Sequence, residues 1–279
     1  MLEFLGQSAL VQFVIDRYPL ILQGDLYRYL IGAGGVFLVV NVLLSARLVS
    51  RKIRPETPGA RQMLREILAS LRTVVIFSAV GLSIAVLASL GVLPVYADPA
   101  EYGWVYFAFN VILLIVGHDA WFYWTHWIMH RPRFFRRFHR LHHRSHNPTP
   151  WTAYAFDAGE ALVNAIYLLA VMAIMPTSVL AAFIFTAHMM LRNAIGHCGY
   201  EIFPAGRDGR PRFDWLTTVT HHDLHHARPR TNFGFYFTFW DKVMGTEDPT
   251  YYDEYLRAVG TCSLRKSPRK AAVLQEVKQ

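Results

Sequence analysis

Long apolar stretches are the feature that most restricts what this chain of 279 residues can fold into. A helix that crosses the hydrocarbon core of a bilayer needs about 20 mostly apolar residues. Three stretches have the required length: residues 29–46, residues 73–97, and residues 102–117, which continue as helix through "HDAWFYWTHWIMH". Only 17% of the residues are charged, against about 25% in an average soluble domain. We therefore expect an all-α, integral membrane helical bundle.

A fourth apolar stretch, residues 161–191, is too long for one span and too short for two complete ones. Pro176 lies near its middle and divides it. A single kinked helix would place its two ends on opposite sides of the membrane. A hairpin of two short helices would return the chain to the side on which the stretch begins. We expect the hairpin, because it keeps the histidine clusters before and after the stretch on one face.

The distribution of positive charge predicts the orientation of these spans. The loops after the first and third spans, residues 47–72 and 130–144, are rich in arginine, whereas the "DPAE" loop after the second has only acidic charges. Positive residues accumulate in cytoplasmic loops, so we expect the histidine clusters on the cytoplasmic face. The net charge of +8 fits such loops, and we expect no nucleic-acid partner. The short, unfused chain favours the bacterial inner membrane.

Three histidine clusters lie close to the ends of the predicted spans. In "HWIMH", His126 and His130 are one helical turn apart and share a helical face. "HRLHH" and "HDLHH" have identical spacing. These triplets are His139, His142 and His143, and His222, His225 and His226. A lone histidine on an apolar face is usually a core residue, but two identical triplets and a pair are hard to attribute to chance.

The number and type of these side chains predict a metal site. Imidazole binds iron, zinc, copper and nickel, and a single zinc ion takes only three or four protein ligands, so the clusters predict two ions. Cys198 and Cys262 are too few for a thiolate zinc site or an iron–sulfur cluster. A divalent-metal transporter or another membrane metal-binding protein is the alternative class, but a transporter should place its ligands near mid-membrane. A di-haem protein has no use for triplets with adjacent histidines.

As a set, these motifs resemble the membrane-bound fatty acid hydroxylase or sterol desaturase superfamily over residues 119–246. "DAWFYWTHWIMH", "HRLHHRSHNPTPWTAYAFDAGE" and "HHDLHHARPRTNFGFYFTFWDKVMGT" are similar to its three histidine boxes, and "NAIGHCGYE" is similar to the segment before the third. The resemblance implies two non-haem iron ions, activation of dioxygen, and hydroxylation or desaturation of an unactivated C–H bond in a lipid. Zinc can replace iron in overexpressed material.

Transferred position by position, the resemblance implies a set of histidine ligands. They are His126, His130, His139, His142, His143, His197, His222, His225 and His226. Asn193 stands where some members have a further histidine, and it either holds an iron through water or packs as an amide. Asp157 stands at another position that is often histidine. His188 lies on roughly the opposite helical face from His197 and is expected to be packed or to face the substrate.

Metal-bound histidines normally donate their second N–H to a carboxylate or a carbonyl. Two acidic residues are placed to accept such bonds. Asp119 lies seven residues before His126 and shares its helical face, and Asp223 lies inside the third box. We therefore expect Asp119 and Asp223 to support the metal-binding rings.

The chain is expected to have three parts: transmembrane helices in residues 1–100, a catalytic domain with a cytoplasmic helical cap in residues 101–250, and a basic C-terminal tail in residues 251–279. The substrate is expected to be a lipid that enters from the bilayer. No haem, flavin or iron–sulfur motif is present in the sequence. A separate ferredoxin, b-type cytochrome or reductase must then supply electrons, and the basic segment 131–144 offers a docking face for an acidic donor.

Overall fold

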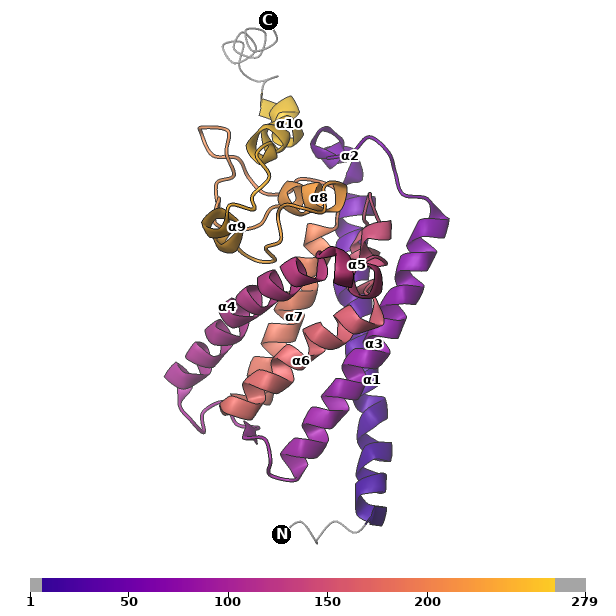
Figure 1. The fold of residues 1–279 in the computed structure, drawn as a ribbon, viewed down its shortest axis with the longest axis vertical. Coiled ribbons are helices and arrows are strands. Elements are labelled where there is room, and N and C mark those ends of the chain that lie inside the picture. The colour runs from indigo at the N-terminus through magenta and orange to yellow at the C-terminus, as the bar shows by residue number, and fades with distance from the viewer. Residues whose placement is uncertain (1–6, 264–279) are drawn as a thin grey trace, which may run out of the picture.

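The computed structural model describes residues 7–263, in which long helices form a bundle beneath a cap of shorter elements (Figure 1). The long helices are α1 (Gln7–Val36), which continues into the π-helix η1 (Phe37–Leu43), α3 (Ala60–Ser89), α4 (Trp104–Met129), α6 (Ala158–Ile174) and α7 (Val179–Gly196). Four helical segments of this part are long and apolar enough to cross a membrane: Ser8–Leu43, α3, α4 and α7. The prediction of an all-α membrane bundle is confirmed.

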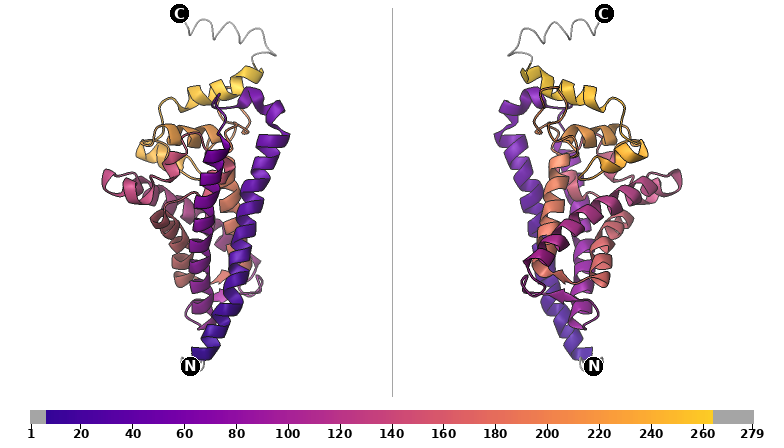
Figure 2. Two further views of the ribbon diagram at one scale, coloured as in Figure 1. Left: turned by 90° about the vertical axis from the view of Figure 1, so that its right-hand side faces the viewer. Right: turned by 90° about the vertical axis from the view of Figure 1, so that its left-hand side faces the viewer.

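Most of the shorter elements gather at one end of the bundle, while the described chain begins at the other, narrower end (Figure 2). They are α2 (Ser45–Leu48), η2 (Val49–Arg51), α5 (Pro132–Phe138), η3 (His142–Arg144), η4 (Pro150–Tyr154), α8 (Val219–Ala227), α9 (Phe239–Met244) and α10 (Tyr251–Ser263). The predicted basic tail thus starts as helix α10, whose Tyr251 and Tyr255 pack with Leu224 of α8. Residues 264–279, the rest of that tail, lie outside the described residues.

The first two long helices extend further than the sequence predicted. The first begins well before residue 29. Arg28, which directly precedes the predicted span, forms an ion pair with Asp25 on the same helix. Ser78 of α3 also donates a hydrogen bond of 2.8 Å to Asp25. Polar partners thus satisfy both charges inside the bundle. The helix α3 begins at Ala60 rather than at residue 73.

The predicted hairpin is confirmed: α6 and α7 are separate helices joined by a short turn that contains Pro176. In this turn β2 (Thr177–Ser178) pairs in parallel with β1 (Val95–Tyr96), which follows α3. The hydroxyl of Tyr106 donates a hydrogen bond of 2.8 Å to the carbonyl of Pro176. These contacts join the turns at the end opposite the cap, so the segments before α6 and after α7 both lie at the cap end (Figure 1).

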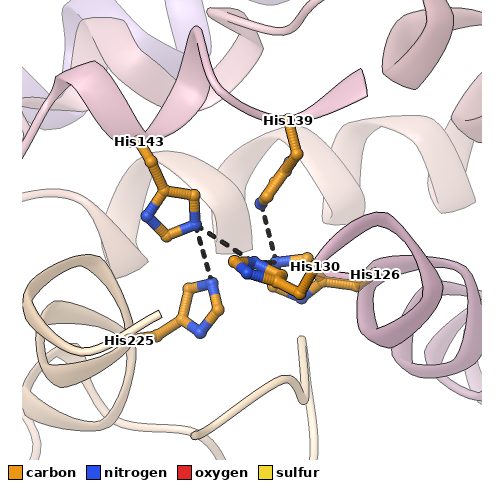
Figure 3. A group of neighbouring side chains, drawn as sticks. All are labelled: His126, His130, His139, His143 and His225. Carbon is orange, nitrogen blue, oxygen red and sulfur yellow. Dashed lines mark hydrogen bonds between the residues drawn. The ribbon is translucent and has the colours of Figure 1, made fainter. Parts of the chain in front are cut away.

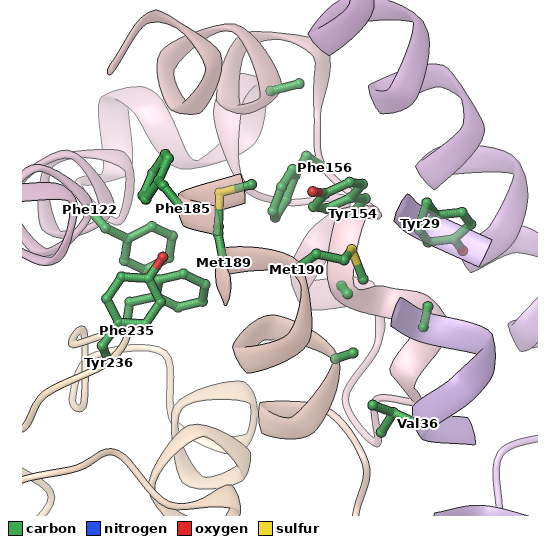
Figure 4. Packing of buried hydrophobic residues seen from close by; sticks show 14 of the residues in the cluster. Tyr29, Val36, Phe122, Tyr154, Phe156, Phe185, Met189, Met190, Phe235 and Tyr236 are labelled. Atoms are coloured by element: carbon green, nitrogen blue, oxygen red, sulfur yellow. The ribbon is translucent and has the colours of Figure 1, made fainter. Parts of the chain in front are cut away.

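A continuous buried core fixes the helices that lead to the cap (Figure 4). The rings of Tyr29 and Tyr154 stack with their centroids 5.8 Å apart. Gly32 of α1 lies so close to Met190 of α7 that an added Cβ would be 2.5 Å from the Met190 Cγ. Since close-packed interiors resist displacement, this core holds α4 and α7 in fixed positions beneath α8.

Candidate metal centre

The clustered histidines of the sequence meet in two groups where the bundle joins the cap. The first group contains His126, His130, His139, His143 and His225 (Figure 3), and the second contains His142, His197, His222 and His226. Within each group, the potential donor nitrogens all lie within 4.8 Å of one another. The groups are adjacent, since the ring centroids of His143 and His226 are 5.0 Å apart. The fold therefore brings together every histidine of the expected ligand set.

Four separate segments supply the first group. His126 and His130 stand one turn apart at the end of α4, His139 follows α5, His143 lies in η3 and His225 in α8. The Nε2 atom of His126 lies 2.9 Å from that of His139 and 3.2 Å from that of His130. The Nε2 atom of His143 lies 3.1 Å from that of His225. The rings thus point the same nitrogen toward a common centre (Figure 3).

The second group is built in the same way from three segments. The Nε2 atom of His197, at the end of α7, lies 3.0 Å from that of His222 and 3.1 Å from that of His226, both in α8. The ring centroid of His142 in η3 lies 4.7 Å from that of His226. Since η3 and α8 each contribute to both groups, the two candidate metal positions are built as one unit.

The convergence of these nitrogens fits a bound cation. Burial and the neighbouring imidazoles lower the pKa of His142, His222 and His226 well below its usual range. Burial also lowers the pKa of His197 to about 4, although its hydrogen bond to the Asn193 backbone raises it. The rings are therefore neutral at pH 7, which is the metal-binding form. Neutral nitrogens facing one another at these distances leave unpaired acceptors in a buried space, and metal ions would satisfy them.

The opposite ring nitrogens have partners that fix several of these histidines. The Nδ1 atoms of His126, His197 and His225 donate hydrogen bonds of 2.9, 2.7 and 2.7 Å to the backbone carbonyls of Phe233, Asn193 and Thr231, respectively. Such bonds direct the Nε2 lone pair toward a metal. Sequence reasoning missed these partners, because any residue type can supply a backbone carbonyl.

Glu160 is the carboxylate that lies against a histidine of the expected set. Its Oε1 atom is 2.8 Å from Nδ1 of His139, and both side chains are buried. In the sequence Glu160 was only one of several acidic residues near the boxes. Its place as the last residue of the second box segment, in the first turn of α6, was the available signal.

The expectation for Asp119 and Asp223 was wrong, because neither bonds to a histidine of the two groups. Asp119 accepts hydrogen bonds from the backbone N–H groups of Tyr236 and Phe237, at 2.7 and 3.1 Å. Asp223 forms an ion pair with Arg54, whose Nε atom is 2.8 Å from Asp223 Oδ1. Both carboxylates are satisfied by partners distant in sequence. They anchor loops beside the site instead of orienting metal-binding rings.

Asn193 and Asp157, the two positions at which the sequence departs from the expected histidine pattern, both have structural partners. The side-chain amide of Asn193 donates to the carbonyl of Ala153, and its own backbone carbonyl accepts from His197. These bonds support the packing alternative for Asn193 over a water-mediated contact with a metal. Asp157 Oδ2 accepts a hydrogen bond of 2.7 Å from the backbone N–H of Leu141. It therefore anchors the segment that contains the second histidine triplet.

His118 and His188 lie outside both groups. The Nδ1 atom of buried His118 is 3.0 Å from the hydroxyl of Tyr236. The ring of His188 packs 4.7 Å from the ring of the same tyrosine. The two histidines therefore flank Tyr236 beneath the candidate metal centre rather than forming part of it.

Comparison with known proteins places the site in a family. The family model "Fatty acid hydroxylase" matches residues 111–246. A Delta(7)-sterol 5(6)-desaturase of Gibberella zeae is 30% identical over 152 residues, which are 54% of this chain and 45% of that protein. Cholesterol 25-hydroxylase of Mus musculus is 28% identical over 172 residues, which are 61% of this chain and 57% of that protein.

A third relative is named for a different activity. A very-long-chain aldehyde decarbonylase of Oryza sativa subsp. japonica is 30% identical over 161 residues, which are 54% of this chain and 25% of that protein. The match thus spans about half the length of the first two relatives and a quarter of the third. No solved structure matches the chain. Residues 111–246, which contain both histidine groups, therefore form a fatty acid hydroxylase domain that is similar to sterol desaturases and a cholesterol hydroxylase.

Proposed function

We propose that this protein is a membrane-bound, non-haem di-iron oxygenase that hydroxylates or desaturates an unactivated C–H bond of a lipid. The observation that supports this most directly is the pair of adjacent groups of buried imidazoles at the end of an apolar bundle. Relatives include a sterol desaturase and a cholesterol hydroxylase. In this proposal residues 101–250 form the catalytic domain, and residues 1–100 supply membrane helices that pack against it.

Two irons held by the histidine groups would supply dioxygen activation and the one-electron chemistry that breaks a C–H bond. The chain's own residues hold and orient the donor nitrogens. The carbonyls of Phe233 and Thr231 keep Nε2 of their histidines unprotonated. The stacked rings of Phe122 and Phe235, 4.4 Å apart, close the membrane side of the first group, because Phe122 also contacts His126.

Electrons would come from a separate acidic protein that docks on α5. Four arginines of this helix and its end, Arg133, Arg136, Arg137 and Arg140, line an open depression. Among the side chains that the structure describes, no carboxylate lies within 4 Å of these guanidinium groups. Unpaired positive charge next to the site would attract a ferredoxin, a b-type cytochrome or a reductase. The arginine bias also supports a cytoplasmic site, and in this proposal the membrane is the bacterial inner membrane.

Elemental analysis of protein purified without oxygen in mild detergent should find about two iron atoms per chain, because each histidine group has enough ligands for one ion. Zinc in their place would leave the geometry intact, since imidazole binds both metals. One metal per chain, or none after growth with ample iron, would contradict a di-iron centre.

Labelling from outside intact cells should distinguish the two ends of the α6–α7 hairpin. A Pro176→Cys variant should react with a membrane-impermeant maleimide, because the turn lies at the end opposite the histidine groups. An Arg207→Cys variant should react only after the membrane is opened, since this exposed residue follows the hairpin on the cap side. The unmodified chain controls for Cys198 and Cys262. Reaction of the Arg207→Cys variant on intact cells would refute the cytoplasmic orientation.

A further inference from the structure

An open pocket reaches the first histidine group from the surface. It has a volume of about 550 Å³ and ends at His130, which is the partly exposed member of a group whose other members are buried. The second group is buried throughout. This pocket therefore gives a molecule of lipid size an approach to the candidate metal centre.

The inner walls of the pocket are aromatic. The ring centroid of His130 lies 5.2 Å from that of Phe233 and 5.4 Å from that of Phe135. The two phenylalanines therefore flank His130. Trp127, one turn before Arg131 on the chain, completes this apolar lining. A surface of this kind suits the hydrocarbon part of a ligand, because burying it there removes apolar area from water.

Two arginines give the pocket a positive charge, and no acidic residue lines it. The guanidinium of Arg131 stacks on the indole of Trp127, 3.4 Å from its centroid, and this contact restrains the plane of its donors. Arg230 lies in the loop after α8. No described carboxylate lies within 4 Å of either one, whereas the nearby Arg228 is paired with Asp248 at 3.1 Å. The pocket arginines therefore keep their donors free for a ligand.

We propose that this pocket selects an amphiphile with an anionic head group as the substrate. Arg131 and Arg230 bind the carboxylate or phosphate of the head, and the aromatic walls hold the adjoining hydrocarbon beside His130. Guanidinium groups match the oxygens of either anion. An uncharged sterol would leave both arginines without a partner, and a cationic lipid would be repelled. This inference rests on the proposed function, and it assigns Arg131 to the substrate while the arginines of α5 serve the electron donor.

The test is a binding measurement on the purified full chain in mild detergent. The probes are 5-doxyl-stearate, a spin-labelled carboxylate, and its uncharged methyl ester, which quench the fluorescence of nearby tryptophan. The acid should bind at least about tenfold more tightly than the ester, since a charged hydrogen bond is worth this much. The Arg131→Gln and Arg230→Gln variants should each bind the acid about tenfold more weakly. Their affinity for the ester should be unchanged. The Trp127→Phe variant should lose most of the quenching.

Arg207→Gln, at an exposed position in another loop, is the matched control and should bind the acid normally. Displacement of the bound 5-doxyl-stearate by palmitate is then compared with displacement by hexadecyl phosphate. The stronger competitor identifies the preferred head group. Equal binding of acid and ester, or equal loss in Arg207→Gln, would overturn the proposal. Binding needs neither metal nor turnover, so failure of the oxygenase proposal would show separately, in iron content and product formation.

Discussion

Replacing His142 or His225 by alanine is expected to reduce lipid oxidation by more than about a hundredfold, beyond what the loss of an outer partner of a metal ligand costs. Each residue belongs to a different group, so each variant should also lose about one of the two metal ions while keeping the other. Product formation and elemental analysis on the same preparations measure both effects. The two variants should therefore share an inactive phenotype for different reasons.

His188→Ala is the matched control for these variants. His188 is a histidine of α7 that packs on Tyr236 at 4.7 Å and lies outside both groups. Its replacement should leave the metal content at the level of the unmodified chain. If the His142→Ala and His188→Ala variants retained equal metal, the proposed ligand set would be wrong.

Replacing Glu160 by alanine is expected to weaken metal binding about 10- to 100-fold, because His139 loses the buried carboxylate that lies 2.8 Å from its Nδ1. The metal affinity of Glu160→Gln should fall between those of the unmodified chain and Glu160→Ala, since its amide oxygen is a hydrogen-bond acceptor. Competition with a chelator under anaerobic conditions gives the affinity. The effect should be largest for the first histidine group, to which His139 belongs.

A structural role for Glu160 alone would give a different result. In that case the thermal unfolding of both variants would change while the affinity of the folded protein for metal stayed constant. Glu101→Gln, at an exposed position in the turn before α4, is the control and should alter neither quantity. Unchanged metal affinity in Glu160→Ala would remove Glu160 from the candidate site.

The membrane bundle and the histidine set could be predicted because both are local properties of the chain. The length of an apolar stretch decides whether a helix can cross a bilayer, and α4 runs through the first histidine pair as the sequence indicated. Pro176 marked the hairpin, since proline disfavours a continuous helix. The first helix starts earlier than its apolar stretch predicts, because Asp25 neutralises Arg28 inside the helix.

The division of the histidines between two groups could not be predicted from their spacing. The two triplets have the same sequence spacing, but one lies on the regular helix α8, while the other begins after α5 and ends in the 3-10 helix η3. In each triplet the outer two residues enter one group and the middle one enters the other. Which group receives which residue depends on how η3 and α8 face each other, and that is set by packing.

Hydropathy and residue type, which need no knowledge of distant contacts, predict a helical membrane protein with enough imidazole for two metal ions. The groups that orient those imidazoles depend on tertiary packing. Asp119 and Asp223 were plausible partners by spacing, yet backbone N–H groups and Arg54 bind them. Glu160 and three backbone carbonyls take that place. Hydrogen bonds act over about 3 Å, so such partners are set by the packing of segments far apart in the chain.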